Sequence, residues 1–161
     1  MSNAVQSPLV VILMGSGADR DHCAKIAGML AKLEVEHVQR IGSAHKTPEH
    51  VLELVAHYEG LGRPVVWVTV AGRSNALSAF VDAKVVSPVV SCPPLSMTED
   101  IWSSLRMPSD VAPLVVLDPA NAGLAAAKIA ALYDPALRRR IADHKLGEAA
   151  KVTTADAEIQ T

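Results

Sequence analysis

Apolar runs typical of buried strands alternate with segments of helical spacing along almost the whole chain. The strand-like runs cover residues 9–14, 35–41, 65–70, 88–91 and 114–117. The segments with helical spacing cover residues 21–33, 48–58, 75–83, 99–105, 120–132 and 135–150. Strands that alternate with helices join through right-handed crossovers, which build a parallel sheet with helices on both faces. We therefore expect an α/β fold, a three-layer sandwich around a flavodoxin-like parallel sheet.

The length of the chain predicts a single domain over residues 1–161. We expect residues 1–8 to form a flexible lead, residues 9–150 the folded body, and residues 151–161 a polar tail. The lead lacks the basic start and the long apolar stretch of a signal peptide. Two cysteines give no disulfide framework, so the sequence indicates a cytoplasmic protein with reduced thiols.

Charge and aromatic content argue against two classes of partner. The formal net charge is −2 and aromatic residues make up 3% of the chain, so neither electrostatics nor base stacking favours nucleic-acid binding. No apolar run approaches the roughly 20 residues that a membrane-spanning helix requires. The sequence therefore favours a small-molecule partner over nucleic acid or a membrane.

Small or polar residues follow each of the first four predicted strands. These loops cover residues 15–19, 42–47, 71–75 and 92–96. Because the carboxyl ends of parallel strands meet at one edge of a sheet, we expect the four loops to open on the same side. Ligands of open α/β sheets bind at this edge, so the sequence predicts the functional site there.

The first loop resembles a dinucleotide-binding fingerprint but breaks its glycine pattern. Gly15 and Gly17 are present, whereas Arg20 stands at the position of the third glycine. Main-chain N–H groups in a small-residue turn that opens a helix nevertheless favour a phosphate, and Ser16 adds a hydroxyl donor. Asp19 either caps the following helix or accepts ribose hydroxyls, and the sequence leaves both interpretations open.

The second loop brings Ser43, His45 and Lys46 close together at a predicted strand end. A hydroxyl and an ammonium group hold an anion, and an imidazole transfers protons near neutral pH. The simpler interpretation is that Ser43 or Thr47 caps the helix that begins near Pro48, while His45 is exposed without a role.

The third loop joins Gly72 to three side-chain donors, Arg73, Ser74 and Asn75. A turn followed by a helix start is the simpler interpretation of this pattern. The sequence contains neither the spacing of metal-ligating residues nor a phosphate-binding P-loop motif. We therefore expect no metal and no cofactor.

Several motifs taken together resemble one family of purine biosynthesis. They read MGSGAD, SAHKTPEHV, AGRSNALSAFVDA, SCPP and WSSLRMPSD, and they lie between about Val10 and Asp134. Their order and content are similar to the phosphoribosylaminoimidazole carboxylases of class II, in which SAHK is followed by AGRSN. Class I enzymes, which are mutases, resemble SAHR with a GGAAHLPG-like third loop. Ala18 departs from the family pattern, which usually has a serine with a phosphate-binding or capping hydroxyl there.

The resemblance implies that CO2 is added to C4 of 5-aminoimidazole ribonucleotide, giving 4-carboxy-5-aminoimidazole ribonucleotide in de novo purine biosynthesis. It implies a carbon–carbon lyase that requires no biotin, metal or ATP. It also implies a symmetric homo-oligomer, an octamer or a tetramer. Two alternatives remain open: a mutase acting on N5-carboxyaminoimidazole ribonucleotide, and a non-enzymatic nucleotide- or flavin-binding module.

The resemblance also implies a role for each residue of the loops. Ser16, Ser43 and Lys46 would bind the nucleotide, with Asp19 on the ribose. The new carboxylate would be surrounded by Gly72, Arg73, Ser74 and Asn75. His45 would carry the C4 proton, and together with Lys46 it would form the catalytic pair.

Overall fold

A five-stranded parallel sheet forms the centre of the structure, a computed structural model that describes residues 6–160. The strands are β1 (Leu9–Met14), β2 (His37–Ile41), β3 (Val65–Val70), β4 (Val89–Ser91) and β5 (Leu114–Val115). The helices are α1 (Arg20–Lys32), α2 (Pro48–Glu59), α3 (Ala76–Asp82), α4 (Trp102–Leu105), α5 (Pro119–Ala130) and α6 (Pro135–Ile159). Short 3-10 turns, Gly17–Asp19 and Thr98–Ile101, precede α1 and α4. Every predicted segment contains an element of the predicted type, although β2 and β5 are shorter than expected.

The strand order is β2-β1-β3-β4-β5 with every neighbouring pair parallel, which confirms the flavodoxin-like prediction. All side chains of β1 and β3 are buried at the centre of the sheet, as their continuous apolar runs indicate. The chain leaves β1 toward β2 on one side and returns to β3 on the other side. This reversal opens a crevice outside the carboxyl ends of β1 and β3, where such sheets bind ligands.

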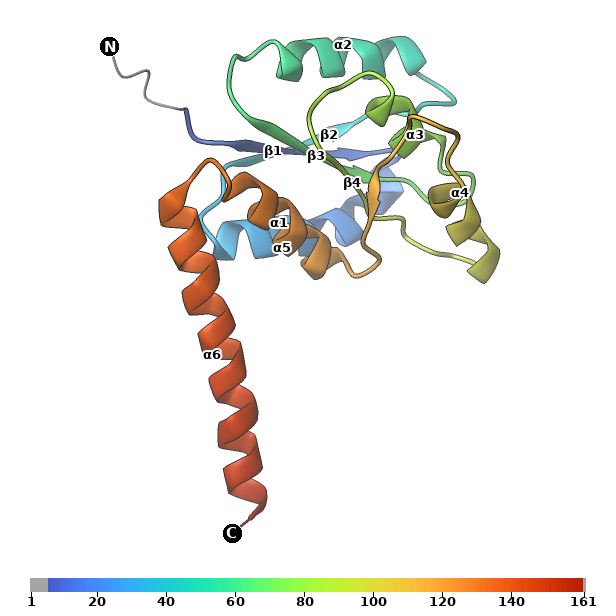
Figure 1. The fold of residues 1–161 in the computed structure, drawn as a ribbon. Coiled ribbons are helices and arrows are strands. Elements are labelled where there is room, and N and C mark those ends of the chain that lie inside the picture. The colour runs from blue at the N-terminus through green and yellow to red at the C-terminus, as the bar shows by residue number, and fades with distance from the viewer. Residues whose placement is uncertain (1–5, 161) are drawn as a thin grey trace, which may run out of the picture.

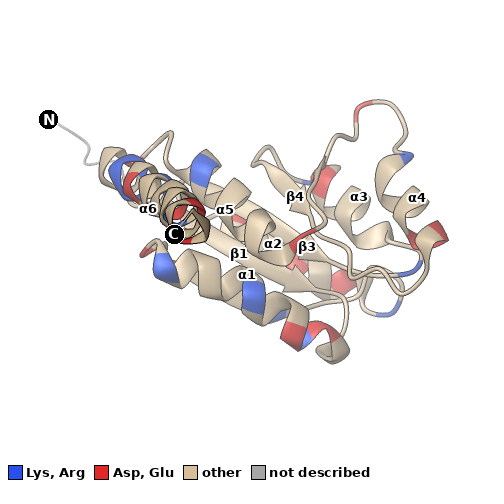
Figure 2. Cartoon of the chain, turned by 90° about the horizontal axis from the view of Figure 1, so that it is seen from below, with Lys and Arg blue, Asp and Glu red and all other residues tan. Residues whose placement is uncertain are grey.

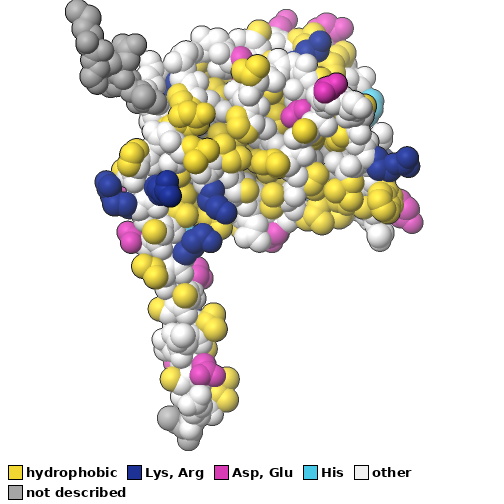
Figure 3. Space-filling model, viewed as in Figure 1, with side chains coloured by type: hydrophobic (Ala, Val, Ile, Leu, Met, Phe, Trp, Pro, Cys, Tyr) yellow, Lys and Arg dark blue, Asp and Glu magenta, His cyan; other side chains and the backbone are white. Residues whose placement is uncertain are grey.

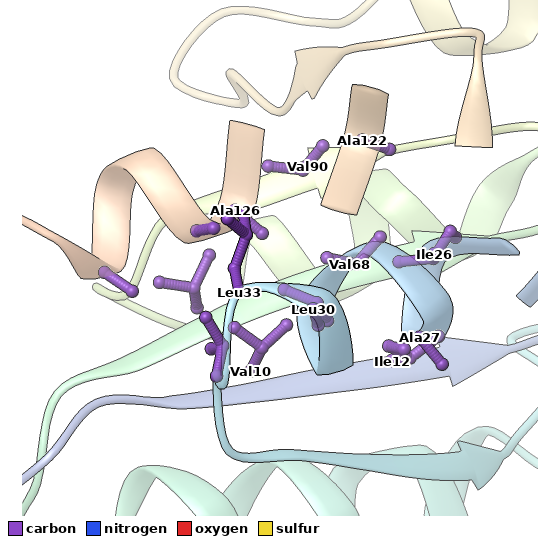
Figure 4. Close-up of a cluster of buried hydrophobic side chains, with 14 of the residues drawn as sticks. Val10, Ile12, Ile26, Ala27, Leu30, Leu33, Val68, Val90, Ala122 and Ala126 are labelled. Atoms are coloured by element: carbon purple, nitrogen blue, oxygen red, sulfur yellow. The ribbon is translucent and has the colours of Figure 1, made fainter. Parts of the chain in front are cut away.

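Helices cover both faces of the sheet, and each face has its own apolar core (Figure 1). On one face, α1 and α5 pack over strand side chains such as Ile12 and Val68 (Figure 4). On the other face, α2 and α3 pack over a core that includes Leu13 and Trp67. Successive strand residues thus enter opposite cores, and this explains why the central strands are apolar at every position.

The last helix, α6, projects away from the body (Figure 1). It is longer than the sequence predicts. We expected a helix that ends at Ala150 and a polar tail beyond it, but α6 continues to Ile159. The carboxylate of Asp134 caps its first turn. An ion pair between Glu148 and Lys151, at 2.8 Å, supports a later turn. Polarity alone therefore gave the wrong end, because a polar segment with local ion pairs can continue a helix without burial against the rest of this chain.

The two chain ends are described in part. Residues 1–5 and residue 161 lie outside the described residues, so the expected flexible lead is described only from Gln6. Within it, the Ser7 carbonyl oxygen accepts a hydrogen bond from Arg63 Nε at 2.7 Å. Within residues 6–160, no helix combines the length and the hydrophobicity that crossing a membrane requires.

Candidate active site

A cavity of about 750 Å³ opens where the loops after β1, β2, β3 and β4 meet at the carboxyl edge of the sheet. It brings together eight of the residues singled out from the sequence: Ser16, Asp19, Ser43, His45, Lys46, Gly72, Arg73 and Ser74. Asn75 is absent from its lining. The other lining residues are Gly15, Ala18, Ala44, Ala71, Ala76, Leu77, Pro94, Leu95 and Ser96. The expected convergence of the four loops is therefore present.

In the loop after β1, the residue that caps the helical turn is Ser16, and the half-buried carboxylate of Asp19 does not act as a cap. Ser16 Oγ accepts the Ala18 N–H at 3.2 Å and caps the 3-10 turn before α1. Asp19 immediately precedes α1 but makes no side-chain capping hydrogen bond. Burial raises the pKa of the Asp19 carboxyl above its ordinary value, against the opposing effect of a hydrogen bond with the Ser16 main chain. The geometry favours a ligand acceptor at Asp19 over a helix cap.

The loop after β2 is folded by hydrogen bonds between Ser43 and Thr47, and His45 and Lys46 are exposed at its turn. The Ser43 N–H donates to Thr47 Oγ1 at 3.0 Å, and the Thr47 N–H donates to the Ser43 carbonyl oxygen at 2.8 Å. The Ser43 hydroxyl accepts the Lys46 N–H at 3.3 Å, so its own hydrogen remains for a ligand. Thr47 begins α2 without a side-chain cap. Neither Ser43 nor Thr47 therefore caps α2 with its side chain, and the hydrogen of the Ser43 hydroxyl is left without an acceptor within this loop.

A left-handed residue and a close main-chain contact shape the loop after β3. Arg73 has a φ of 53°, a conformation that residues with side chains adopt rarely. A Cβ atom on Gly72 would lie 2.7 Å from the Pro94 carbonyl oxygen, so only glycine fits there. The Ser103 hydroxyl donates to the Arg73 carbonyl oxygen at 2.7 Å and so ties the loop to α4.

Asn75 lies beneath this loop rather than in the cavity. The residue is 2% exposed, and its side-chain oxygen accepts the Ser78 N–H at 3.2 Å, which caps α3. Its amide nitrogen lies within hydrogen-bond distance of the hydroxyls of Ser78, Ser91 and Ser104, at 2.8, 3.1 and 2.9 Å, and its two hydrogens are shared among them. The structure thus separates Asn75 from the other predicted site residues, because its polar atoms are engaged in a buried cluster.

The loop after β4 and the start of α3 supply lining residues that the sequence analysis did not single out. Pro94, Leu95 and Ser96 come from this loop, and Leu77 comes from α3. Ser96 Oγ donates to Asp100 Oδ2 at 2.7 Å, and hydrogen bonds from Ser96 and the following main chain hold the pKa of Asp100 below its ordinary value. The sequence signals for these residues were the loop after a strand end and the SCPP and AGRSNALSAFVDA motifs, since most of the side chains are not reactive types.

Two titratable groups next to the cavity loops are poorly suited to nucleophilic chemistry. His22 Nε2 lies 3.2 Å from Sγ of Cys92, the first residue of the loop after β4. Burial raises the pKa of the Cys92 thiol to about 12 and lowers the pKa of His22. Cys92 is therefore a protonated core residue, which agrees with its interpretation as a small buried hydrophobe.

The charges around the cavity suit an anionic ligand that also carries hydroxyl groups. Lys46 and Arg73 are exposed cations on different loops, and Asp19 is the acidic residue of the lining. Ammonium and guanidinium groups form strong charge-assisted hydrogen bonds with phosphate and carboxylate. Within residues 6–160, no three His, Cys, Asp or Glu side chains gather closely enough to hold a metal ion.

Comparisons with known proteins agree on one family. The model of the AIR carboxylase family matches residues 9–151. The phosphoribosylaminoimidazole carboxylase of Treponema denticola is 47% identical over 156 residues, which cover 95% of this chain and 98% of that protein. The carboxylase of the same name from Archaeoglobus fulgidus is 50% identical over 153 residues, which cover 93% of this chain and 84% of that protein. The crystal structure of Treponema denticola PurE matches with a TM-score of 0.93 at 46% identity, covering 96% of this chain and 99% of that one.

Proposed function

Because the chain belongs to the AIR carboxylase family, we propose that it joins CO2 to C4 of 5-aminoimidazole ribonucleotide. The product is 4-carboxy-5-aminoimidazole ribonucleotide, an intermediate of de novo purine biosynthesis. One observation carries the proposal: hydroxyl, imidazole, ammonium and guanidinium groups line a single cavity of about 750 Å³. That volume lies in the range of small-molecule sites and suits a ribonucleotide.

The nucleotide is anchored by the loops after β1 and β2. The Ser16 and Ser43 hydroxyls and the Lys46 ammonium bind the phosphate-bearing part, and Asp19 accepts ribose hydroxyls. Two observations support this assignment. The Asp19 carboxylate makes no capping hydrogen bond at α1, and the Ser43 hydroxyl, which accepts the Lys46 N–H, still has its own hydrogen to donate. Lys46 supplies the charge that makes an anion contact strong.

CO2 and the new carboxylate lie against the loop after β3, at Gly72, Arg73 and Ser74. This loop has a fixed shape, because Gly72 meets the main chain at Pro94 and Ser103 holds the Arg73 carbonyl oxygen. Donors that are fixed before the reaction stabilise developing negative charge without reorganising. The loop therefore holds a weak electrophile close to C4 and stabilises the charge that forms on it.

The reaction forms one carbon–carbon bond and releases one proton. The ring carbon C4, made nucleophilic by the neighbouring amine, attacks the carbon of CO2. One electron pair of a C=O bond moves onto oxygen and gives the carboxylate. C4 then carries a hydrogen and the carboxylate, and loss of that hydrogen as a proton restores the aromatic ring. His45 accepts the proton, since imidazole transfers protons well near neutral pH. The ammonium group of Lys46, the next residue, lines the same cavity.

The mutase of the same family, acting on N5-carboxyaminoimidazole ribonucleotide, is the second candidate. Lys46 and the sequence of residues 72–75 favour the carboxylase, because the SAHK and AGRSN motifs resemble class II enzymes. The deciding experiment incubates purified protein with 5-aminoimidazole ribonucleotide and bicarbonate, and separately with the N5-carboxylated nucleotide. We expect product formation that depends on CO2. Turnover of the N5-carboxylated nucleotide alone favours the mutase, and a bound chromophore without turnover favours a binding module.

We also propose that the active form is a homo-oligomer, a tetramer or an octamer, in which a second copy covers α6. The buried residues of this long helix are Leu137 and Ile141, near its start. Three apolar residues farther along, Leu146, Val152 and Ile159, are 69%, 71% and 85% exposed. Figure 3 shows hydrophobic side chains along the projecting helix, and Figure 2 shows charges of both signs on it. An isolated helix with so little burial is poorly stable in water, which favours a partner.

Light scattering during size-exclusion chromatography tests this assembly. We expect the natural chain to elute at four or eight times the mass of one chain. A double variant, Leu146→Ser with Val152→Ser, should dissociate because it removes apolar side chains from α6. Val86→Ser is the matched control, since Val86 is fully exposed but lies outside α6. A natural chain that elutes as a monomer contradicts the proposal.

A further inference from the structure

We propose that Ser103 and Asn75 are positioning residues, which hold the loop at residues 71–74 in its working shape without touching the substrate. The inference rests on the proposed function, because it assigns a task to the fixed shape of that loop. Neither residue belongs to the cavity lining. Their link to the cavity is a set of hydrogen bonds to the loop main chain and to a buried cluster below it.

Ser103 holds the loop on both sides of Ser74. Its hydroxyl oxygen accepts the Asn75 N–H at 2.8 Å, and the hydroxyl donates to the Arg73 carbonyl oxygen at 2.7 Å. The Asp100 carbonyl oxygen, in the turn that leads into α4, also lies 2.8 Å from this hydroxyl, so the two carbonyl oxygens share its one hydrogen. One side chain thus contacts the two peptide groups on either side of Ser74, which lines the cavity.

The loop needs this restraint because its conformation is unfavourable by itself. Arg73 has a φ of 53°, in the left-handed region that side chains disfavour. Strained conformations of this kind persist only where surrounding contacts determine them. Without the hydrogen bond to its carbonyl oxygen, Arg73 is expected to relax toward negative φ. The directions of the Arg73 guanidinium and the Ser74 hydroxyl would then change.

Asn75 anchors the end of the loop in a buried polar cluster with Thr69, Ser78, Ser91 and Ser104. The exposed fraction of these four partners is 0–1%. Thr69 Oγ1 lies 2.8 Å from Ser78 Oγ, and Ser78 Oγ donates to Ser91 Oγ at 2.8 Å. Asn75 itself bonds residues of α3, β4 and α4, and Thr69 of β3 joins the cluster through Ser78. A buried network in which every member is paired is rigid, and removing one member leaves the others unsatisfied.

The position of the restraint predicts a selective defect. The loop at residues 71–74 faces the CO2 and the carboxylate in the proposed function, whereas Ser16, Ser43 and Lys46 anchor the nucleotide from other loops. Loosening this loop therefore weakens the use of CO2 more than the binding of nucleotide. Partial unfolding lowers the number of active molecules but leaves both substrate constants unchanged, so the two effects differ.

Ser103→Ala is the informative variant, because Ser103 is only partly buried, whereas replacing Asn75 risks unfolding the protein. We expect the CO2 concentration for half-maximal rate to rise by about tenfold or more, with little change in the dissociation constant of the nucleotide. Ser103→Thr keeps the hydroxyl and should recover most of the loss. Ser87→Ala is the matched control: this serine donates to Glu59 at 3.0 Å outside the cavity lining, and both constants should stay unchanged. An equal rise in both constants for Ser103→Ala overturns the proposal.

Hydrogen–deuterium exchange gives a second measurement that does not depend on activity. We expect peptides covering residues 71–76 to exchange faster in Ser103→Ala than in the natural chain or in Ser87→Ala. Unchanged exchange overturns the positioning role, whatever the kinetics. A natural chain without CO2-dependent turnover refutes the proposed function instead, and exchange still decides whether Ser103 holds the loop.

Discussion

Gly72 and the Pro94 carbonyl oxygen meet so closely that a Cβ on Gly72 would lie 2.7 Å from that oxygen. This contact joins the loop after β3 to the loop after β4, and residues of both loops line the cavity. The obstacle is a main-chain atom, so no side-chain rotation relieves it. The spacing of these two loops, and with it the width of the cavity, depends on a glycine at this position.

Gly72→Ala should therefore push the two loops apart. We expect a loss of stability of about 1–3 kcal/mol from the forced shift, and a fall of about tenfold or more in kcat/KM. Urea denaturation and steady-state carboxylation measure the two effects. The matched control is Gly28→Ala in α1, where a Cβ would meet nothing within 4 Å. That variant should gain about 0.5–1 kcal/mol and keep its activity. If Gly72→Ala behaves like Gly28→Ala, the close contact does not constrain the cavity.

The fold and the edge that carries the cavity could be predicted because both follow from local patterns. A continuous apolar run such as residues 65–70 has no solvated face, so it indicates a strand covered on both sides. Alternation with helices then fixes the parallel sheet and the edge at which its loops meet. These rules placed His45 and Lys46 beside Arg73, although they lie in separate loops.

The features that local patterns could not predict depend on contacts between distant parts of the chain. Asn75 has the residue type of a ligand donor, but its partners include Ser104, which no spacing rule connects to it. Pro94 lines the cavity, but its side chain has no reactive group that would mark it as a site residue in the sequence. The length of α6 could not be predicted from local pattern, because its last part is polar and includes weak helix formers such as Val152 and Thr153.

His45→Asn should preserve nucleotide binding and remove most of the carboxylation. Asparagine is of similar size but does not accept and release a proton near neutral pH, so kcat is expected to fall by about 10²–10⁴-fold. Calorimetric titration with nucleotide and a direct carboxylation assay separate the two properties. His50→Asn, an exposed histidine on α2 outside the cavity lining, is the control and should leave both unchanged. Near-normal turnover of His45→Asn would remove His45 from the mechanism.

Lys46→Ala should weaken nucleotide binding, because it removes the ammonium proposed to contact the phosphate. Loss of a charge-assisted hydrogen bond is expected to raise the dissociation constant by about 10- to 100-fold. Lys84→Ala removes an equal charge outside the cavity lining and serves as the control. The difference between the two variants should shrink as salt is added, since ions screen an exposed contact. An unchanged affinity in Lys46→Ala places the anion contact elsewhere in the cavity.

The ion pair between Glu36 and Arg63 predicts a defined pH dependence of stability. Arg63 donates to both carboxylate oxygens of Glu36, with Nη1 at 3.0 Å from Oε1, and this holds the pKa of Glu36 below its ordinary value of 4.5. A carboxyl whose pKa is lower in the folded state adds stability above its unfolded pKa. That stability is lost as the pH falls through the lowered folded value. Because the Glu36 side chain is 55% exposed, the contribution is below about 1 kcal/mol.

Glu36→Gln should therefore be slightly less stable than the natural chain at neutral pH, and the difference should close as the pH falls below 4.5. Glutamine keeps the size of the side chain and leaves Arg63 its hydrogen bond to the Ser7 carbonyl oxygen, so the variant removes mainly the charge. Urea denaturation at a series of pH values measures the difference in unfolding free energy. Glu99→Gln, an exposed glutamate in the turn before α4, controls for the loss of one negative charge. A difference that stays constant at acidic pH shows that geometry rather than charge holds Glu36 to Arg63.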